Sequence, residues 1–288
     1  MGSSGRSPSL RRALLAWYEP RRRAFPWRRT RDPYRILVSE VMLQQTQAAR
    51  VVPSYRAFTR RFPNVRELAS ASRRDVLIAW DGLGYNRRAI ALAEAARGIV
   101  REHDGRVPAD AEALQRLRGV GPYTAAAVGS IAFGSPVAAV DTNVRRVVGR
   151  VLAGVDGHEL GAAETRRLAE TWLDRHDPGA WNQALMDLGR EVCRPQPRCD
   201  GCPLREGCRF LALGRMPSEP ARRPGPFEGS SRQLRGSVVR ALRARPSSSL
   251  DELTRRTGAA PGRVLAAVEG LAADGLVELR GRRVSLPR

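Results

Sequence analysis

Apolar residues recur at helical spacing along most of this chain, and the alternation typical of half-buried strands is scarce. Leu10, Leu14 and Trp17 fall on one face of the first such segment, and a proline ends it. Helices are predicted over residues 9–19, 32–49, 53–62, 64–68, 72–80, 86–103, 110–117, 124–132, 140–152, 162–175 and 181–192. Because each helix must bury its apolar stripe against another element, the sequence predicts an all-α fold over residues 9–213.

A change in composition marks a further segment. Residues 214–231 contain four prolines and three glycines, which predicts a linker. Beyond it the pattern predicts helices at 233–245, 250–257 and 261–274, and short strands at 276–279 and 283–286. A helix, a helix-turn-helix and a hairpin in this order predict a winged helix. A chain of 288 residues is long enough for such a second module beside the main core.

The chain is strongly basic. Fifty basic residues against 29 acidic ones give a formal net charge of +21. Such a charge favours a polyanionic partner, because neutralising phosphates releases counterions. A biased base composition of the genome is a second explanation, and the absence of lysine from the sequence indicates such a bias. The bias explains arginine in place of lysine but not the excess over acidic residues, so nucleic acid is the expected partner.

Two features indicate the compartment. No apolar run reaches the roughly 18 residues that span a membrane, and the N-terminus lacks the apolar core of a signal peptide. Four cysteines lie in one short stretch, which fits a metal site in a reducing compartment better than disulfides. They are Cys193, Cys199, Cys202 and Cys208. We therefore expect a cytoplasmic protein that acts at the chromosome, whose four thiolates hold either a [4Fe–4S] cluster or zinc.

The stretch from Val38 to Gln47 places one carboxylate among apolar residues and amides. Burial penalises a charged carboxylate, so the pKa of Glu40 is expected to be raised, and Glu40 is expected to donate a proton near neutral pH. The amides, among them Gln44 and Gln45, are suited to bind base edges or to fill a gap in a base stack. A glutamate taken alone is more often a surface residue of an ordinary amphipathic helix, and the rest of the chain overturns that interpretation here.

Gly119-Val120-Gly121 lies between two predicted helices and has the pattern of a helix-hairpin-helix. Glycines allow a tight turn and a close approach of the backbone, and the following helix presents free N–H groups to a phosphate. Such contacts position DNA without reading its sequence. Two glycines alone are more often a plain turn, but here Pro-Tyr-Thr-Ala at 122–125 follows, and then Asp141. The residues predicted to contact DNA here are Gly119, Gly121 and Thr124.

Five motifs occur in order along the chain: Val38–Gln47, Gly82–Tyr85, Gly119–Ala125, Val140–Val144 and the cysteine tail. In this order they resemble the adenine DNA glycosylase (MutY) family, within the helix-hairpin-helix superfamily that includes endonuclease III. The resemblance covers roughly residues 10–210. It implies a helix-hairpin-helix DNA glycosylase fold with a cleft between two domains. The implied parts are an iron–sulfur cluster domain (1–28 and 136–213) and a six-helix domain (29–135). The linker (214–231) and the winged helix (232–288), predicted above from composition and pattern, follow them.

The resemblance assigns catalysis to two carboxylates. Glu40 would protonate the departing adenine and activate the water, and Asp141 would stabilise the oxocarbenium-like state of the sugar. Asp141 is also expected to cap the next helix. Asn143 resembles the family's asparagine that supports these groups, and Tyr123 stands where bifunctional relatives carry the lysine of their Schiff base. Since the sequence contains no lysine, a monofunctional enzyme is expected.

The same resemblance assigns contacts with the duplex. Gln44 and Tyr85 resemble the residues that wedge into the duplex beside the orphan base, where inserted side chains fill the gap left by a flipped nucleotide. Asn86 replaces the second aromatic residue often found after this tyrosine. Arg87 and Arg88 are expected to contact phosphates, although two arginines on a solvated helix face give the same pattern.

For the cysteines, the resemblance favours a [4Fe–4S] cluster over zinc. The gap after the first cysteine contains five residues, 194–198, where the family usually has six. The expected role of the cluster is to shape a basic loop that contains Arg194, Arg198, Arg205 and Arg209. Hydrolysis needs no redox step. Thr142 stands where many family members have glycine, and the sequence gives no physical reason for this difference.

The expected function is base excision repair by a monomer that flips and removes adenine mispaired with 8-oxoguanine or guanine in double-stranded DNA. Longer family members end in a domain that recognises 8-oxoguanine, whereas this sequence ends at Arg288 after the predicted winged helix. The predicted wing carries Arg280, Arg282 and Arg283. Two other functions remain open: a glycosylase for thymine or uracil opposite guanine, and a non-enzymatic DNA-binding protein.

Overall fold

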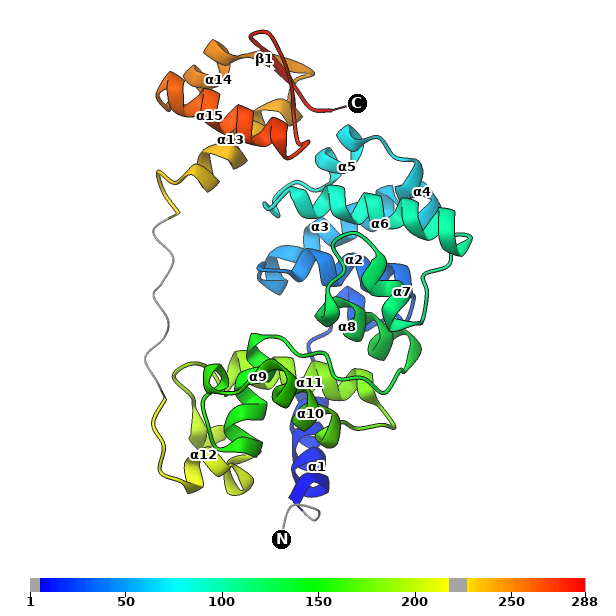
Figure 1. Ribbon diagram of the computed structural model, residues 1–288, viewed down its shortest axis with the longest axis vertical. Coiled ribbons are helices and arrows are strands. Elements are labelled where there is room, and N and C mark those ends of the chain that lie inside the picture. The colour runs from blue at the N-terminus through cyan, green and yellow to red at the C-terminus, as the bar shows by residue number, and fades with distance from the viewer. Residues whose placement is uncertain (1–5, 218–226, 288) are drawn as a thin grey trace. The chain divides into compact units, whose positions relative to one another are not determined.

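The structure is a computed structural model that describes residues 6–217 and 227–287 (Figure 1). Residues 1–5, 218–226 and 288 lie outside this description, and with them the middle of the predicted linker. Among the described residues, helices are the only regular elements up to Ala212, and strands occur only between Ser247 and Ser285. The predicted all-α fold of residues 9–213 is confirmed. In residues 6–217 and 227–287, no helix is long and apolar enough to cross a membrane.

The chain divides into two compact units. The first consists of Met1–Glu40, Pro108–Arg116 and Val120–Arg223, and the second of Val41–Val107, Leu117–Gly119 and Pro224–Arg288. The first unit contains α1 (Arg6–Tyr18), most of α2 (Pro33–Leu43), α7 (Ala111–Arg116), α8 (Pro122–Phe133), α9 (Thr142–Val148), a π-helical turn (Gly149–Ala153), α10 (Ala162–Trp172), α11 (Pro178–Glu191) and α12 (Arg209–Ala212). The second unit contains α3 (Ala48–Arg61), α4 (Val65–Ser70), α5 (Arg73–Ala79), α6 (Arg87–His103), α13 (Ser231–Arg243), α14 (Leu250–Thr257), α15 (Pro261–Ala273), β1 (Ser247–Ser249), β2 (Glu278–Arg280) and β3 (Arg283–Ser285).

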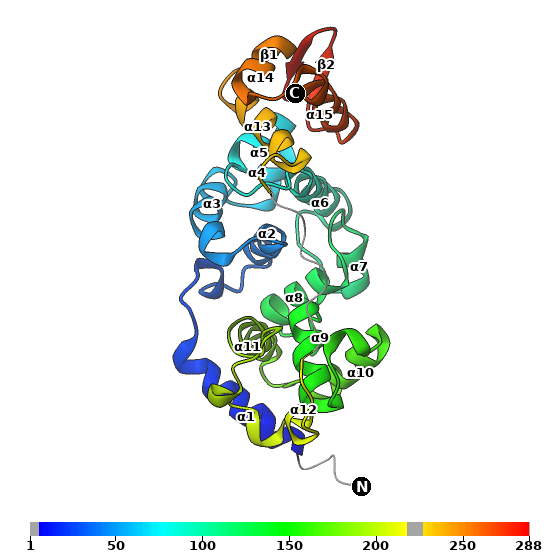
Figure 2. The ribbon, with the colours of Figure 1, turned by 90° about the vertical axis from the view of Figure 1, so that its left-hand side faces the viewer.

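Helix α11 is central to the first unit and packs against α1, α8 and α9 (Figure 2). Trp181 on α11 meets Trp172 on α10 edge-to-face, with ring centroids 5.7 Å apart, and Leu14 of α1 belongs to the same buried cluster. Buried aromatic pairs of this kind contribute both area and preferred geometry. The packing therefore fixes α11 against the helices that carry most of the site residues.

The second unit has its own core around α6, which packs against α4 and α5. Ala89, Ala93 and Ala96 are buried on α6, and their small side chains allow close helix packing. Phe58 of α3 lies edge-on to Trp80, with ring centroids 5.8 Å apart. This core holds the end of α5, from which the Gly82–Tyr85 turn departs.

Two predicted helix ends are wrong by five residues or more. Helix α2 ends at Leu43 rather than near residue 49, and α3 begins at Ala48 rather than at Pro53, which lies inside it. Gln45 has a φ of 54°, in the left-handed region that interrupts a helix. The row of glutamines is therefore a turn between two helices. Because proline is common in the first turn of a helix, the sequence pattern predicted a start at Pro53. It did not show the helical turn that precedes Pro53.

The C-terminal segment contains a three-stranded antiparallel sheet in the order β1-β3-β2. Val284 of the central strand pairs with Ser248 of β1 and with Leu279 of β2. The three predicted helices and the hairpin are present. Strand β1 was not predicted, because its three serines lack a strand pattern and become a strand by pairing with β3. This order of elements supports a winged helix, which we retain as a proposal.

Candidate active site

Glu40 lies on α2 with 5% of its surface exposed, and Leu37 one turn earlier is also buried. Burial raises the pKa of Glu40 to about 7, because a desolvated carboxylate is penalised when it is charged. A hydrogen bond from Tyr123 and the charge of Arg28 lower this pKa, and the charge of Asp141 raises it. The buried carboxyl with a raised pKa agrees with the expectation from its apolar surroundings.

The Tyr123 hydroxyl links Glu40 to α11. Tyr123 lies in the first turn of α8, and its hydroxyl is 2.8 Å from Sδ of Met186 and also hydrogen-bonds to Glu40. A hydroxyl has one proton, and a carboxylate is a better acceptor than a thioether, so the proton points to Glu40 whenever Glu40 is ionised. Burial and the nearby carboxylates raise the pKa of Tyr123 well above its ordinary value, so the hydroxyl stays protonated.

Asp141 is the N-cap of α9, as the sequence predicted. Its Oδ1 accepts a hydrogen bond from the backbone N–H of Val144 at 2.7 Å, and its Oδ2 accepts one from Nδ2 of Asn143 at 2.8 Å. Both carboxylate oxygens thus have a donor, which fixes the direction in which the group points. The structure brings Glu40, Tyr123, Asp141 and Asn143 together within the first unit.

A chain of hydrogen bonds leads from Asp141 to the first cysteine. Oδ1 of Asn143 accepts from Nη2 of Arg146 at 3.0 Å. The same guanidinium donates to the carbonyls of Gly189 and Cys193, both at 2.7 Å. Arg146 was not predicted as a site residue, because the two carbonyls that it binds lie more than 40 residues away along the chain.

Arg28 and Asp187 form a buried ion pair that sequence reasoning missed. Two parallel hydrogen bonds of 2.8 and 2.9 Å join them, and their side chains are 8% and 7% exposed. Next to this pair, Tyr18 donates to Oε1 of Gln183 at 2.7 Å. Nothing in the local sequence separates Arg28 from the other arginines of its basic connector. The pair matters for Glu40 because the Arg28 charge acts on its pKa.

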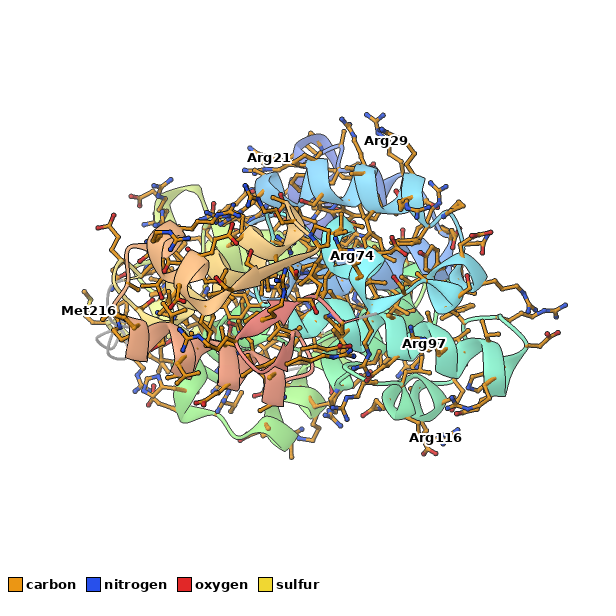
Figure 3. The ribbon with its side chains drawn as sticks, turned by 90° about the horizontal axis from the view of Figure 1, so that it is seen from above. Arg21, Arg29, Arg74, Arg97, Arg116 and Met216 are labelled. Atoms are coloured by element: carbon orange, nitrogen blue, oxygen red, sulfur yellow. The ribbon has the colours of Figure 1, made fainter. Side chains whose placement is uncertain are left out.

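The neighbouring arginines are placed differently. Arg29 points away from the ribbon (Figure 3). A polar cavity of about 280 Å³ is lined by Arg22, Arg29 and Arg31 together with Arg28 and Gln183. Four arginines against one aspartate, Asp177, give this cavity an excess of positive charge, which would attract a polyanion.

The predicted hairpin is present between α7 and α8. Gly119 has a φ of 78°, and a Cβ there would lie 2.8 Å from Cβ of Ala91, so this position requires glycine. Gly121 caps α8 in an extended conformation, and a Cβ would meet nothing within 4 Å, so its surroundings are open to a ligand. Thr124 is only 2% exposed, so its side chain faces the interior, and the structure does not support a side-chain contact with DNA.

The other residues predicted to contact DNA lie in the second unit. Tyr85 is 49% exposed and has a φ of 45°, and Gln44 is half-buried in the turn after α2. The guanidinium of Arg88 donates to the carbonyls of Val41 (2.9 Å), Met42 (3.0 Å) and Gln44, which satisfies the end of α2. Burial lowers the pKa of Arg88 to about 10. The prediction of a phosphate contact is thus not supported for Arg88, whereas its neighbour Arg87 is exposed.

The four cysteines line one mainly apolar pocket, together with Leu188, Val192 and Phe210. Cys193 and Cys208 are buried, and Cys199 and Cys202 are partly exposed. In the described residues, no three cysteine, histidine or acidic side chains converge on one point as the ligands of a single ion do. Buried Arg150 donates to Sγ of Cys193 at 3.9 Å and to the carbonyls of Arg194 and Pro195 at 2.7 and 2.9 Å. The bonds to the two carbonyls fix the start of the five-residue segment between Cys193 and Cys199.

Comparisons with known proteins identify the family of the chain. Residues 38–174 match the family model described as HhH-GPD superfamily base excision DNA repair protein. The chain is 45% identical over 238 residues to an adenine DNA glycosylase of Mycobacterium tuberculosis, covering 80% of this chain and 77% of that protein. It is 40% identical over 271 residues to the adenine DNA glycosylase of Mycolicibacterium smegmatis, covering 92% and 91%. The human adenine DNA glycosylase is 44% identical over 77% of this chain and 42% of its own length.

Solved structures have the same fold. A thermostable thymine-DNA glycosylase aligns with a TM-score of 0.69 and 32% identity, over 74% of this chain and all of that one. Endonuclease III in a trapped covalent intermediate with DNA aligns with a TM-score of 0.57 and 25% identity, over 64% of this chain and 87% of that one. Similarity at this level over most of the length, together with the buried carboxyl and the hairpin, shows that the chain belongs to the adenine DNA glycosylase family of base excision repair enzymes.

Proposed function

We propose that this DNA glycosylase is monofunctional and removes adenine paired with 8-oxoguanine or guanine. The observation that carries the proposal is the buried Glu40, whose pKa of about 7 leaves a large fraction protonated near neutral pH. An acid with this pKa is well matched to protonation of a departing base. Excision of adenine from DNA is the activity of the family. The identity of the opposite base and the monofunctional action are the proposed parts.

In the proposed reaction, the flipped adenosine enters the site with its glycosidic bond near Glu40. Glu40 donates its proton to a ring nitrogen of adenine, so the bond between C1′ and the base breaks and neutral adenine leaves. Asp141 stabilises the positive charge that develops on the sugar. A water molecule then adds its hydroxyl to C1′ and gives its proton to the Glu40 carboxylate, which restores the starting acid.

Tyr123 and Asn143 have positioning roles in this proposal. Tyr123 donates a hydrogen bond to the carboxylate form of Glu40, which stabilises the form that accepts a proton from water. Asn143 directs Oδ2 of Asp141. Strand cleavage through an imine needs an amine, and the sequence contains no lysine, which supports a monofunctional enzyme.

The cysteine pocket is proposed to hold a [4Fe–4S] cluster. Four thiols on one apolar pocket fit a cluster, and the Arg150 donor at Cys193 is suited to a bound thiolate. The cluster would supply cross-linking of the loop 193–208 rather than hydrolytic chemistry. We expect about four irons per chain, loss of visible absorption in Cys202→Ser, and unchanged absorption in Arg166→Ala, an exposed control on α10 that does not line the pocket. Purified protein with one zinc and no iron would contradict the cluster.

Contacts with double-stranded DNA are proposed for Gly119, Gly121, Gln44 and Tyr85, with Gln44 and Tyr85 as the wedge beside the orphan base. The exposure of Tyr85 and the open surroundings of Gly121 support these contacts. The predicted domain boundaries, a monomeric state and action in the cytoplasm complete the proposal.

The test is single-turnover cleavage of labelled duplexes that contain A:8-oxoguanine, A:G, A:C, G:T or G:U, read with and without hot alkali. Alkali-dependent cleavage at adenine, lost in Glu40→Gln and Asp141→Asn, supports the proposal. Glu112→Gln removes an exposed carboxylate of α7 and serves as the matched control. Cleavage confined to G:T or G:U would contradict the opposite-base assignment, and strand cleavage without alkali would contradict monofunctional action.

A further inference from the structure

Arg243, the last residue of α13, reaches the Gly82–Tyr85 turn from far along the chain. Its Nε donates to the carbonyl of Leu77 at 2.8 Å, and its Nη2 donates to Oδ1 of Asn86 at 3.0 Å. Its Nη1 donates to the carboxylate of Asp81. The Arg243 side chain is 12% exposed and all three of its nitrogens are used, although its Asp81 partner is 68% exposed. The bonds to Leu77 and Asn86 are therefore the better shielded ones, and charge-assisted bonds are strong where water is excluded.

The three acceptors lie on both sides of the turn. Leu77 and Asp81 precede it, and Asn86 follows it directly. Trp80 donates to the carbonyl of Gly84 at 3.1 Å, and Arg50 donates to that of Gly82 at 2.8 Å. Arg88 donates to the carbonyls of Leu83 and Gly84, both at 3.4 Å. None of these side-chain bonds reaches Asn86, where the chain leaves the turn. One guanidinium therefore joins the entry of the turn to its exit.

The link made by Arg243 matters because Tyr85, inside the turn, has a strained backbone. It has a φ of 45°, a conformation that a tyrosine rarely adopts and keeps only where its surroundings enforce it. Tyr85 is 49% exposed, and its ring lies against the Arg88 guanidinium, 5.3 Å from the ring centroid, so one face of the ring is packed while the rest is open. Asn86 is the next residue along the chain, and holding its side chain restricts the backbone directly after the strained position. An aromatic residue at 86, common in the family, offers no amide oxygen to Arg243.

We propose that Arg243 is a positioning residue through which the segment 231–287 holds the Tyr85 turn ready for the duplex, so that mispair binding depends on this segment. The inference rests on the proposed wedge role of Tyr85. The positive charge of the wing does not by itself explain a dependence of mispair binding on this segment. Arg280 pairs with Glu278 at 2.9 Å, and Arg282 pairs with Asp251 at 2.7 Å, so part of its positive charge is already compensated.

The experiment compares Arg243→Ala with Arg240→Ala, which removes an exposed arginine from the same helix. Amide hydrogen exchange of residues 81–88 in the full-length protein without DNA reports the turn directly. We expect faster exchange in Arg243→Ala and no change in Arg240→Ala. Arg243→Lys keeps the charge but not the three-way geometry, so it should exchange at an intermediate rate. Equal exchange in the wild type and Arg243→Ala would overturn the inference.

Single-turnover rates on A:8-oxoguanine duplex, measured against enzyme concentration, report the consequence for binding. Loss of a buried charge-assisted bond should raise the half-saturating concentration about tenfold in Arg243→Ala, with a much smaller effect on the maximal rate. Asn86→Ala should raise the half-saturating concentration by less than Arg243→Ala does. The double variant Arg243→Ala/Asn86→Ala should have the same half-saturating concentration as Arg243→Ala alone. Additive effects, or an equal effect of Arg240→Ala, would overturn the inference. Faster exchange together with unchanged half-saturation in both Arg243→Ala and Tyr85→Ala would instead overturn the wedge role of Tyr85.

Discussion

The hydroxyl of Tyr123 hydrogen-bonds to the carboxyl of Glu40, and this bond opposes the rise in pKa that burial imposes on Glu40. The two effects have opposite signs, and burial is the larger. The balance leaves Glu40 with a pKa of about 7, where both of its protonation states are accessible. A residue that first gives a proton to a base and then accepts one from water needs such a balance.

The first prediction concerns the pH dependence of catalysis. If Glu40 must be protonated to act, the single-turnover rate at saturating enzyme should fall roughly tenfold between about pH 6 and about pH 8. In Tyr123→Phe the bond that favours the carboxylate is lost, so the midpoint of the profile should move to higher pH. Rates measured in quenched-flow across this range check both expectations. A flat profile in the wild-type protein would contradict the role of Glu40 as the acid.

The second prediction concerns stability. The pKa of Glu40 is raised in the folded state, so folding favours its protonated form, and stability is lost as the pH rises from about 4.5 through about 7. Glu40→Gln removes this penalty, so it should be more stable than the wild-type protein above pH 7, by about 3 kcal/mol at most. Urea denaturation at about pH 8 and pH 5 measures the difference, which should shrink at the lower pH. A destabilised variant at both values would contradict the buried, charged carboxylate.

The third prediction concerns Arg28 and Asp187. Asp187→Leu leaves the charge of Arg28 buried without a partner, so it should cost about 3–5 kcal/mol. Arg28→Met should cost less, because Arg190 still donates to Oδ1 of Asp187 at 3.0 Å. The double variant should lose less than the sum, because no unpaired charge remains. Urea denaturation of the two single variants and the double variant completes the cycle. The exposed pair Arg66 and Asp104 serves as the control, and its cycle should give less than about 1 kcal/mol.

Sequence reasoning found the residues whose role shows in a local motif. Glu40 stands in an apolar stretch, Asp141 opens a helix, and Gly119 lies between two helices, so each carried its own signal. The structure adds that Gly119 requires its positive φ, whereas Gly121 has open surroundings. The helical pattern also predicted the fold, because amphipathic periodicity is a property of each segment alone.

Partners distant in sequence remained hidden. Arg28, Arg146 and Arg243 are three of many arginines, and each is distinguished by acceptors that lie 40 or more residues away. Arg88 was assigned to phosphate, although its guanidinium closes the end of α2. Composition identifies a basic protein, but tertiary structure decides which cations face solvent and which hold the backbone.

The fourth prediction uses the close contact of α9 with α11. A Cβ on Gly189 would lie 2.8 Å from Cβ of Asn143 and 3.1 Å from its carbonyl oxygen. Gly189→Ala must therefore push the two helices apart and move the side chain that directs Asp141. We expect a loss of about 1–3 kcal/mol in stability and a fall in the maximal single-turnover rate, with little change in half-saturation by DNA.

Gly236→Ala is the matched control for this substitution. Gly236 also lies inside a helix, but a Cβ there meets nothing within 4 Å, so alanine should be neutral or stabilise by up to about 1 kcal/mol. Urea denaturation and single-turnover cleavage of the two variants separate steric crowding from the general effect of alanine in a helix. If Gly189→Ala kept the wild-type rate, the direction of Asp141 set by Asn143 would not limit the reaction, and the positioning role of Asn143 would be wrong.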